Sequence, residues 1–281
     1  SFSKAADVMG NNQPNITRCM NILENELGCK LFIRSNRGVQ LTIEGERLFE
    51  HVSIAIEQLV SGENELLKDK GLESGLVNIG ASEIALHLFL LNELEVFHHH
   101  YPHVKLRISN HSTPQAVQAL ENGLVDFAVV STPVALKKPL QRIPLYSFHE
   151  ILIGGEEYAE MASEKHSLQE LQDIPLIGIA PGTSTRELYT QYFMRHNLPF
   201  SPDMEVATTD QILPMIQHNL GIGFLPEELA AEHIANGKII QIPIAEPLPE
   251  RKICLIRNVK RPQSIAARSL EEHLTAHRET E

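Results

Sequence analysis

The fold of the front of this chain is decided by the stretch GNNQPNITRCMNILENELG at residues 10–28. Gly10 ends a short helix-forming segment, and Asn12 can cap the next helix, whose first turn accommodates Pro14 because an N–H is not needed there. The apolar residues of this second segment step by four, three and four, which places them on one helix face: Ile16, Met20, Leu23 and Leu27. Gly28 then ends the helix. The pattern predicts two helices joined by a tight turn, the second helix being the longer.

A hairpin and a long helix are predicted next. Strand-like runs at 30–34 and 39–42 flank a turn at 35–38, and Thr42 can cap the helix that follows. The apolar positions of that helix have the spacing of a coiled-coil seam, which favours a dimer helix: Leu48, Val52, Ala55, Leu59, Gly62 and Leu66. An amphipathic helix packed on its own core is the alternative. Residues 68–75 indicate a hinge.

The pattern changes after Gly75, where apolar runs alternate with helical stretches. The expected strands are 76–81, 104–108, 125–130, 151–153, 176–180, 204–207, 221–225, 239–242 and 253–256. The expected helices are 84–99, 114–122, 186–196, 211–219, 226–235 and 265–277. This alternation predicts an α/β fold with a largely parallel, doubly wound sheet, and the number of strands indicates two subdomains.

Charge is distributed unevenly along the chain. Residues 1–50 carry six bases and six acids, so the whole net charge of -12 lies in residues 51–281. The neutral front predicts modest non-specific affinity for DNA. We see no secretory signal and no apolar run that could span a membrane. The three cysteines are well separated, which fits a reducing cytoplasm, and we expect Cys19 and Cys29 to be small core thiols.

Hydroxyl side chains recur where strands lead into helices. In open α/β sheets ligands bind at the carboxyl ends of strands, and helix N-termini there offer free N–H groups to an anion. The predicted effector-binding residues are Ser82, Glu83, Thr113, Ser131, Thr132, Gly182, Thr183 and Phe224. Each hydroxyl taken alone can equally be a plain helix cap.

The sequence shows few signs of an enzyme. Six histidines fall between His87 and His111, but consecutive ones such as His98 and His99 point in different directions on a helix, so no metal site is expected. The G-x-G in Gly221–Pro226 does not open a helix, which argues against a dinucleotide fingerprint. We therefore predict no cofactor, no metal and no catalytic residues. The main hypothesis is a DNA-binding protein whose α/β part senses a small molecule, and two alternatives to it stay open. One is a solute-binding or enzymatic α/β domain with an appended helix-turn-helix, and the other is a DNA-binding protein whose α/β part only assembles subunits.

The first fifty residues resemble the winged helix-turn-helix of LysR-type transcriptional regulators. The residues that carry the resemblance are 1–6, Met9-Gly10, Gln13-Pro14, Arg18, Leu23-Glu24, 26–28, Leu31-Phe32, Arg34, Arg37-Gly38, Leu41-Thr42 and Gly45. The segments 122–128 and 220–226 are similar to parts of the family's effector-binding domain. The likeness covers nearly the whole chain.

The resemblance implies an architecture and partners. A winged helix-turn-helix would span 1–43, a coiled-coil linker helix 44–72, and an effector-binding domain 76–281. That domain would consist of two Rossmann-like subdomains of periplasmic-binding-protein type, 76–151 with 252–281 and then 152–251. The implied partners are double-stranded promoter DNA, a small anionic effector, RNA polymerase and further copies of the chain, as a homodimer or homotetramer. The family also has a helix before Ser1, so we expect this chain to be truncated by about fifteen residues.

The residues expected to contact DNA lie on the second helix and on the hairpin. Gln and Asn can bond adenine and Arg can bond guanine or phosphate, so the start of this helix is expected in the major groove. The arginines of the hairpin are expected on phosphates or in a minor groove. The set is Asn12, Gln13, Pro14, Asn15, Thr17, Arg18, Arg34 and Arg37.

Overall fold

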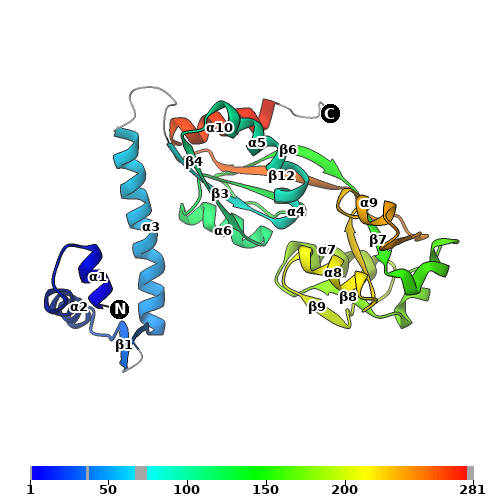
Figure 1. Cartoon of the computed structure of the whole chain (residues 1–281), viewed down its shortest axis with the longest axis horizontal. Helices are drawn as coiled ribbons and strands as arrows, with labels where there is room; N and C mark the ends of the chain where they lie inside the picture. The colour runs from blue at the N-terminus through cyan, green and yellow to red at the C-terminus, as the bar shows by residue number, and fades with distance from the viewer. Residues whose placement is uncertain (1, 36–37, 67–74, 277–281) are drawn as a thin grey trace. The chain divides into compact units, whose positions relative to one another are not determined.

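The structure is a computed structural model that describes residues 2–35, 38–66 and 75–276 (Figure 1). The chain separates into two compact units, residues 1–62 and residues 63–281. We refer to them as the front unit and the α/β unit, and each is described on its own.

The described residues of the front unit form three helices and a two-stranded hairpin. Its elements are α1 (Phe2–Val8), α2 (Gln13–Leu27), β1 (Phe32–Ser35), β2 (Gly38–Leu41) and α3 (Ile43–Leu66), the last of which continues past the boundary between the units. The predicted cap is confirmed, because the Asn12 side chain accepts a hydrogen bond from the N–H of Asn15 at 3.0 Å. Gly28 ends α2 with a φ of 70°, which favours glycine.

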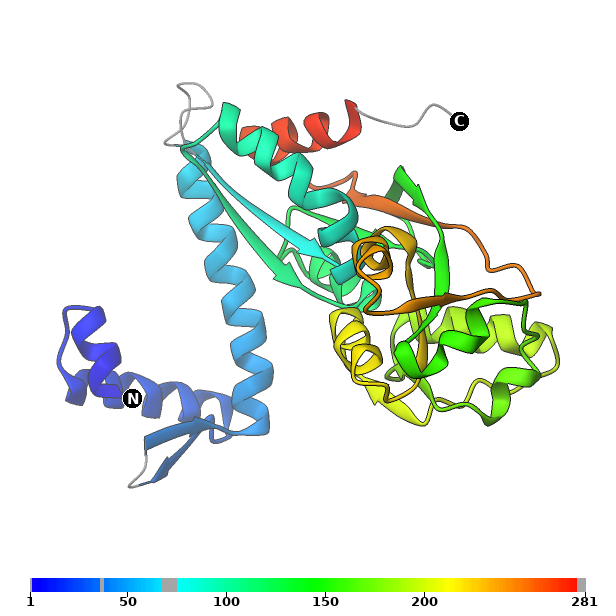
Figure 2. The same ribbon diagram turned by 45° about the vertical axis from the view of Figure 1, so that its right-hand side comes forward.

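The core of the front unit is small. Ala6, Ile16 and Leu31 are buried, and the Phe2 ring meets the Phe32 ring edge-on at 5.2 Å. The predicted apolar face of α2 is wrong at its end, where Leu27 is 50% exposed. Figure 2 shows the hairpin beside the first turn of α3. Thr42 joins the two, since its hydroxyl accepts from the N–H of Gly45 and donates to the carbonyl of Lys30.

Residues 75–276 of the α/β unit form two five-stranded sheets, which we call sheet I and sheet II. Sheet I has the order β4-β3-β5-β12-β6 and sheet II has the order β11-β7-β10-β8-β9. The strands of sheet I are β3 (Gly75–Ala81), β4 (Val104–Asn110), β5 (Phe127–Ser131), β6 (Leu140–Phe148) and β12 (Arg251–Asn258). Those of sheet II are β7 (Glu150–Gly154), β8 (Leu176–Ile179), β9 (Met204–Val206), β10 (Ile222–Pro226) and β11 (Ile240–Ile242).

Helices cover both sheets. Beside sheet I lie α4 (Glu83–Ala85), the π-helical turn η1 (Leu86–Leu90), α5 (Leu91–His100), α6 (Thr113–Asn122) and α10 (Ile265–Ala276). These helices and sheet I form the first lobe. Sheet II forms the second lobe with η2 (Glu156–Ala162), η3 (Glu170–Asp173), α7 (Ser184–Arg195), η4 (Thr209–Gln211), α8 (Ile212–Gln217) and α9 (Glu227–Ala235). The last helix packs on sheet I, since Leu270 and Leu274 of α10 share a buried cluster with Val77 and Leu255.

The prediction of largely parallel sheets is wrong. In sheet I, β3 pairs in parallel with β4 and β5, but β12 pairs antiparallel with both β5 and β6. In sheet II, β8 pairs in parallel with β9 and β10, but β7 pairs antiparallel with both β10 and β11. Strand β6 was not predicted from the sequence. Sheet I contains antiparallel pairs because β6 carries the chain out of the sheet and β12 carries it back in beside β6. Two neighbouring strands that do this must run in opposite directions.

The chain crosses between the two sheets twice. Strand β6 of sheet I leads through His149 into β7 of sheet II, and residues 243–250 lead from β11 back to β12 (Figure 1). Two charged residues stand at these crossings, Glu150 as the first residue of β7 and Arg251 as the first residue of β12. Both side chains are buried.

Candidate functional sites: an exposed helix face and a hydroxyl-lined pocket

The outward face of α2 is polar and exposed. Gln13, Pro14, Asn15 and Arg18 are exposed, and Thr17 is half-buried. Beneath them Ile16 is buried, so the apolar side of the helix fixes the polar side outward. The side chain of Asn15 also donates to Asn11 at 3.0 Å. Six of the eight residues predicted to contact DNA thus lie at the amino-terminal end of one helix.

The predicted hairpin arginines cannot be placed. Arg34 lies on β1, but its side chain is outside the described part of the structure, and Arg37 is outside the described residues altogether. Their contribution to DNA binding stays a prediction.

Glu24 is a residue whose role the sequence analysis missed. It lies on the buried side of α2, where its carboxylate accepts hydrogen bonds from the backbone N–H groups of Leu31 and Phe32 at 2.9 and 3.1 Å. The Lys30 ammonium lies 2.8 Å from the other carboxylate oxygen. The Lys30 hydrogen bond, together with the backbone donors, lowers the pKa of Glu24 to about 2. This carboxylate ties the hairpin to α2, and its spacing of four from Met20 on the buried face is the signal that could have indicated it.

The exposed apolar face of α3 differs from the predicted seam. Val52 and Leu59 belong to the predicted seam and are exposed. Phe49 and Ile56 were not included in that seam, yet they are also exposed, by 60% and 54%. The side chain of Leu66, also predicted in that seam, is outside the described part of the structure. Phe49, Val52, Ile56 and Leu59 follow steps of three, four and three, and we call them the α3 face.

A pocket of about 380 Å³ lies in the α/β unit between the two lobes. The turns that line it follow strands β3, β4, β5 and β8 at their carboxyl ends and precede helices α4, α6 and α7. Six of the predicted effector residues line it: Ser82, Glu83, Thr113, Ser131, Gly182 and Thr183. The lining also includes residues that the predicted set omitted, among them Asn110, His111, Thr185, Thr208 and Thr209.

Two residues of the predicted set lie elsewhere. Thr132 is not part of the lining; its carbonyl accepts from Arg251 at 2.8 Å and its hydroxyl accepts from the N–H of Lys252 at 2.9 Å. Phe224 is buried in the core of the second lobe, stacked on Tyr189 at 4.6 Å. Phe224 was predicted from its place in a glycine-flanked strand, and in the structure that strand is central in sheet II, so the ring packs into the core.

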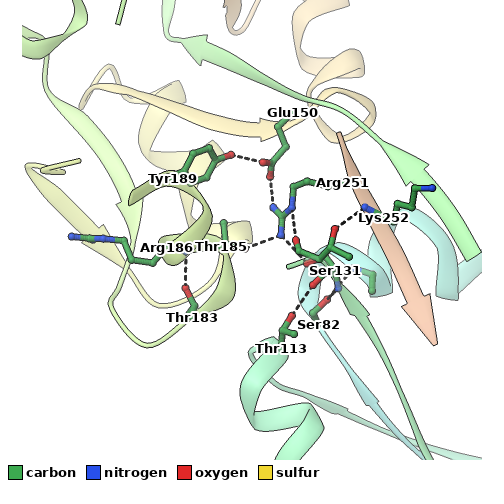
Figure 3. A network of polar contacts seen from close by, with 12 residues as sticks. Ser82, Thr113, Ser131, Glu150, Thr183, Thr185, Arg186, Tyr189, Arg251 and Lys252 are labelled. Carbon is green, nitrogen blue, oxygen red and sulfur yellow. Dashed lines mark hydrogen bonds and ion pairs between the residues drawn. The ribbon is translucent and has the colours of Figure 1, made fainter. Parts of the chain in front are cut away.

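Hydroxyl groups in the pocket are placed to donate. Ser82 Oγ accepts from the N–H groups of Ala85 and Ser131, so its own proton is left for another acceptor (Figure 3). Ser131 Oγ and Thr185 Oγ1 both accept from the guanidinium of Arg251, at 3.0 and 3.1 Å. A hydroxyl that accepts from a cation turns its proton away from that cation. The pocket therefore presents O–H donors to whatever occupies it.

The charged side chains in the lining are few. Glu83 is held at its edge by His87 at 2.8 Å and by Asn110 at 2.5 Å. No lysine or arginine occurs among the described residues that line the pocket. Two arginines hydrogen-bond to lining residues from behind: Arg251 donates to Ser131 and Thr185, and Arg186 donates to the carbonyl of Ile179 while paired with Glu205.

Arg251 and Glu150 form a buried ion pair behind the pocket. The guanidinium donates to a carboxylate oxygen of Glu150 at 2.7 Å, and the Tyr189 hydroxyl donates to the other oxygen at 2.5 Å (Figure 3). Burial, and then the charge of Glu150, raises the pKa of Tyr189 well above its ordinary value, so this hydroxyl remains a proton donor. The network joins both crossings to α7, and the sequence analysis missed it because its members lie far apart in the chain.

Two further observations concern the class of protein. Among the described residues, no group of three or more His, Cys, Asp or Glu side chains is arranged to hold a metal ion. The helices of the described part of the chain include none that is both long and apolar enough to cross a membrane.

The prediction that Cys19 is a core thiol is wrong, since Cys19 is exposed; Cys29 is half-buried.

A helix-turn-helix front and an α/β unit with a pocket at the carboxyl ends of its strands define the class of transcription regulators that combine a DNA-binding and a ligand-binding domain. The description "Bacterial regulatory helix-turn-helix protein, lysR family" matches residues 1–46, and "LysR substrate binding domain" matches residues 70–279. The chain belongs to the LysR family of transcriptional regulators. It is a DNA-binding regulator with an effector-binding domain, not an enzyme.

Relatives and solved structures agree with this assignment. The regulator BbuR of Bordetella bronchiseptica is 28% identical over 89% of this chain and 76% of its own length. YofA of Bacillus velezensis is 30% identical over 85% of this chain and 79% of its own length. The LysR regulator CbnR has the same fold, with a TM-score of 0.77 at 17% identity over 100% of this chain and 94% of that one. A structure of CbnR complexed with its target DNA has a TM-score of 0.75, with 17% identity over 99% of this chain and 94% of that one. The effector-binding domain of QuiR in complex with shikimate has a TM-score of 0.63, with 16% identity over 73% of this chain and 97% of that one.

Proposed function

We propose that this regulator is controlled by a small anionic effector that binds in the pocket between the two lobes. The observation that carries the proposal is the set of hydroxyls of Ser82, Ser131 and Thr185, whose oxygens already accept from backbone N–H groups or from Arg251, so that their protons are left to donate. An anion offers only acceptors, so it satisfies all of them. The amino termini of α6 and α7 add positive potential at the same place. Shikimate, which QuiR binds, is a carboxylate of suitable size.

Calorimetric titration of the intact protein with inorganic sulfate, inorganic phosphate and shikimate tests this proposal. We expect at least one of these anions to bind with 1:1 stoichiometry per chain and to raise the melting temperature. Uncharged glucose serves as the control and is expected not to bind. Equal heats for the anions and for glucose would refute the anionic effector.

We also propose that the front unit reads promoter DNA with α2 in the major groove and with the hairpin as its wing. The exposed Gln13, Asn15 and Arg18 have donors and acceptors that suit base edges, and the structure of CbnR with its target DNA supports DNA recognition in the family. In this proposal the α3 face forms the coiled coil of a homodimer, dimers pair into a homotetramer, and the bound regulator contacts RNA polymerase. The four exposed apolar side chains of the α3 face support the dimer.

Binding to immobilised promoter fragments and to scrambled fragments tests DNA reading. Gln13→Ala and Arg18→Ala are each expected to cost about 1–3 kcal/mol of discrimination between the two. His51→Ala, at an exposed position on α3, is the matched control and is expected to leave the discrimination unchanged. If Gln13→Ala and Arg18→Ala discriminate as well as the unaltered protein, α2 does not read the bases.

A further inference from the structure

Arg251 is fully buried and does not line the pocket, yet its hydrogen bonds reach both sides of it. Nε donates to the carbonyl of Thr132, and one terminal nitrogen donates to Ser131 Oγ and Thr185 Oγ1. Ser131 is the last residue of β5 in sheet I, and Thr185 lies in the first turn of α7 in the second lobe. One guanidinium therefore holds a hydroxyl from each lobe (Figure 3).

The ion pair behind the pocket has a direction. Glu150 bonds the other terminal nitrogen of Arg251, and its second oxygen is occupied by Tyr189. The hydroxyls of Ser131 and Thr185 bond the nitrogen that faces the pocket lining. The positive end of the pair thus faces the pocket-lining hydroxyls, and its negative end faces Tyr189 in the core of the second lobe. In a buried setting such charges are weakly screened.

We propose that Arg251 is a positioning residue for the effector: it turns the protons of Ser131 and Thr185 into the pocket and adds a cationic side chain behind a described lining that contains no lysine or arginine. Glu150 makes a buried arginine tolerable, because an unpaired buried charge is costly, and it reduces the attraction for an anion to a level that allows release. This inference rests on the proposed anionic effector. It assigns the charge selectivity of the site to a residue that the ligand does not touch.

The two partners of the pair are predicted to act in opposite directions, which a purely structural role would not produce. Arg251→Met removes the cation and leaves Glu150 unpaired, so we expect affinity for an anion to fall roughly tenfold or more. Glu150→Gln leaves the guanidinium unneutralised, so we expect affinity to rise severalfold although the protein becomes less stable. In the double variant Arg251→Met/Glu150→Gln the ion pair is gone, and affinity is expected to stay below that of the unaltered protein because the hydroxyls are no longer oriented.

The experiment is calorimetry on the intact protein with sulfate, phosphate and shikimate as probes, with a thermal melt of every variant. Arg257→Met is the matched control, because Arg257 forms an ion pair with Glu271 in the same lobe, away from the pocket. We expect it to bind the probes as the unaltered protein does. If Arg251→Met does not fold, Glu150→Gln still tests the proposal through the expected rise in affinity.

The outcomes separate this inference from the function on which it rests. If the unaltered protein binds none of the probes, the proposed anionic effector fails and the inference fails with it. If the unaltered protein binds a probe and Glu150→Gln weakens that binding, or the double variant binds as tightly as the unaltered protein, the inference alone is overturned. A fall with Arg251→Met together with a rise with Glu150→Gln supports it.

Discussion

Gly45 offers a sharp test of how the hairpin is joined to the long helix. It is buried in the first turn of α3, and a Cβ added there would lie 2.1 Å from the carbonyl oxygen of Leu31 and 3.0 Å from its carbonyl carbon. The obstacle is backbone, and the same carbonyl accepts a hydrogen bond from Thr42 N–H at 3.0 Å. Gly45→Ala must therefore push the hairpin away from α3.

The cost can be worked from this geometry. Overpacking against rigid atoms costs about 1–3 kcal/mol, and alanine regains about 1 kcal/mol of helix propensity. Because the obstacle is backbone, we expect an overpacking cost in the upper part of that range, about 2–3 kcal/mol. After the gain in helix propensity, the front unit should lose about 1–2 kcal/mol of unfolding free energy. In a unit of this size that corresponds to a fall of roughly 4–16 °C in melting temperature. The unit has a small core, formed by Ala6, Ile16 and Leu31, so its total unfolding free energy is small and a loss of this size is a large part of it.

Amide hydrogen exchange on the intact protein, followed by mass spectrometry, is the assay. We expect faster exchange over the hairpin and the first turns of α3, and weaker binding to promoter DNA. Gly80→Ala is the matched control, because a Cβ there meets Val125 and Ala116 at ordinary distances of 3.5 and 3.6 Å. If the two variants exchange alike over the front unit, the close approach of Gly45 to Leu31 does not constrain the fold.

Three further predictions follow from particular side chains. The folded-state pKa of Glu24, about 2, lies below its ordinary value of 4.5, so its carboxylate stabilises the front unit fully above pH 4.5, and this stability is lost as the pH falls toward 2. In thermal melts between pH 2 and 6, the Glu24→Gln variant should lose this acid sensitivity. The Glu26→Gln variant, altered at an exposed position, should retain it. On the α3 face, Ile56→Glu and Leu59→Glu should weaken self-association more than tenfold in sedimentation equilibrium, because a charge would be buried in the dimer seam. His51→Glu, at an exposed position outside the α3 face, should leave self-association unchanged. An equal effect of all three variants would contradict the seam. Iodoacetamide should label exposed Cys19 at least tenfold faster than Cys254, since burial removes access and raises the pKa of the Cys254 thiol; mass spectrometry under native conditions measures the two rates, and equal rates would show that Cys254 is not buried in solution.

Local patterns in the sequence were sufficient for the α-helices and most strands, but not for the 3-10 helices η2 and η3. The α2 helix runs from Gln13 to Leu27 as predicted, because its cap, its first-turn proline and its terminal glycine act within a few residues. The six pocket residues predicted from strand-to-helix turns lie together for a similar reason: the carboxyl ends of neighbouring parallel strands meet at one edge.

What only the tertiary structure decided are the contacts between distant residues. Glu150 and Arg251 are 101 positions apart, and nothing near either residue indicates a buried charge, because each is stabilised by the other. Strand direction was decided in the same way, since β12 takes its orientation from neighbours that the chain reaches only after two crossings. Patterns of polarity report which face of an element is buried, whereas the partner that it meets depends on how the whole chain closes.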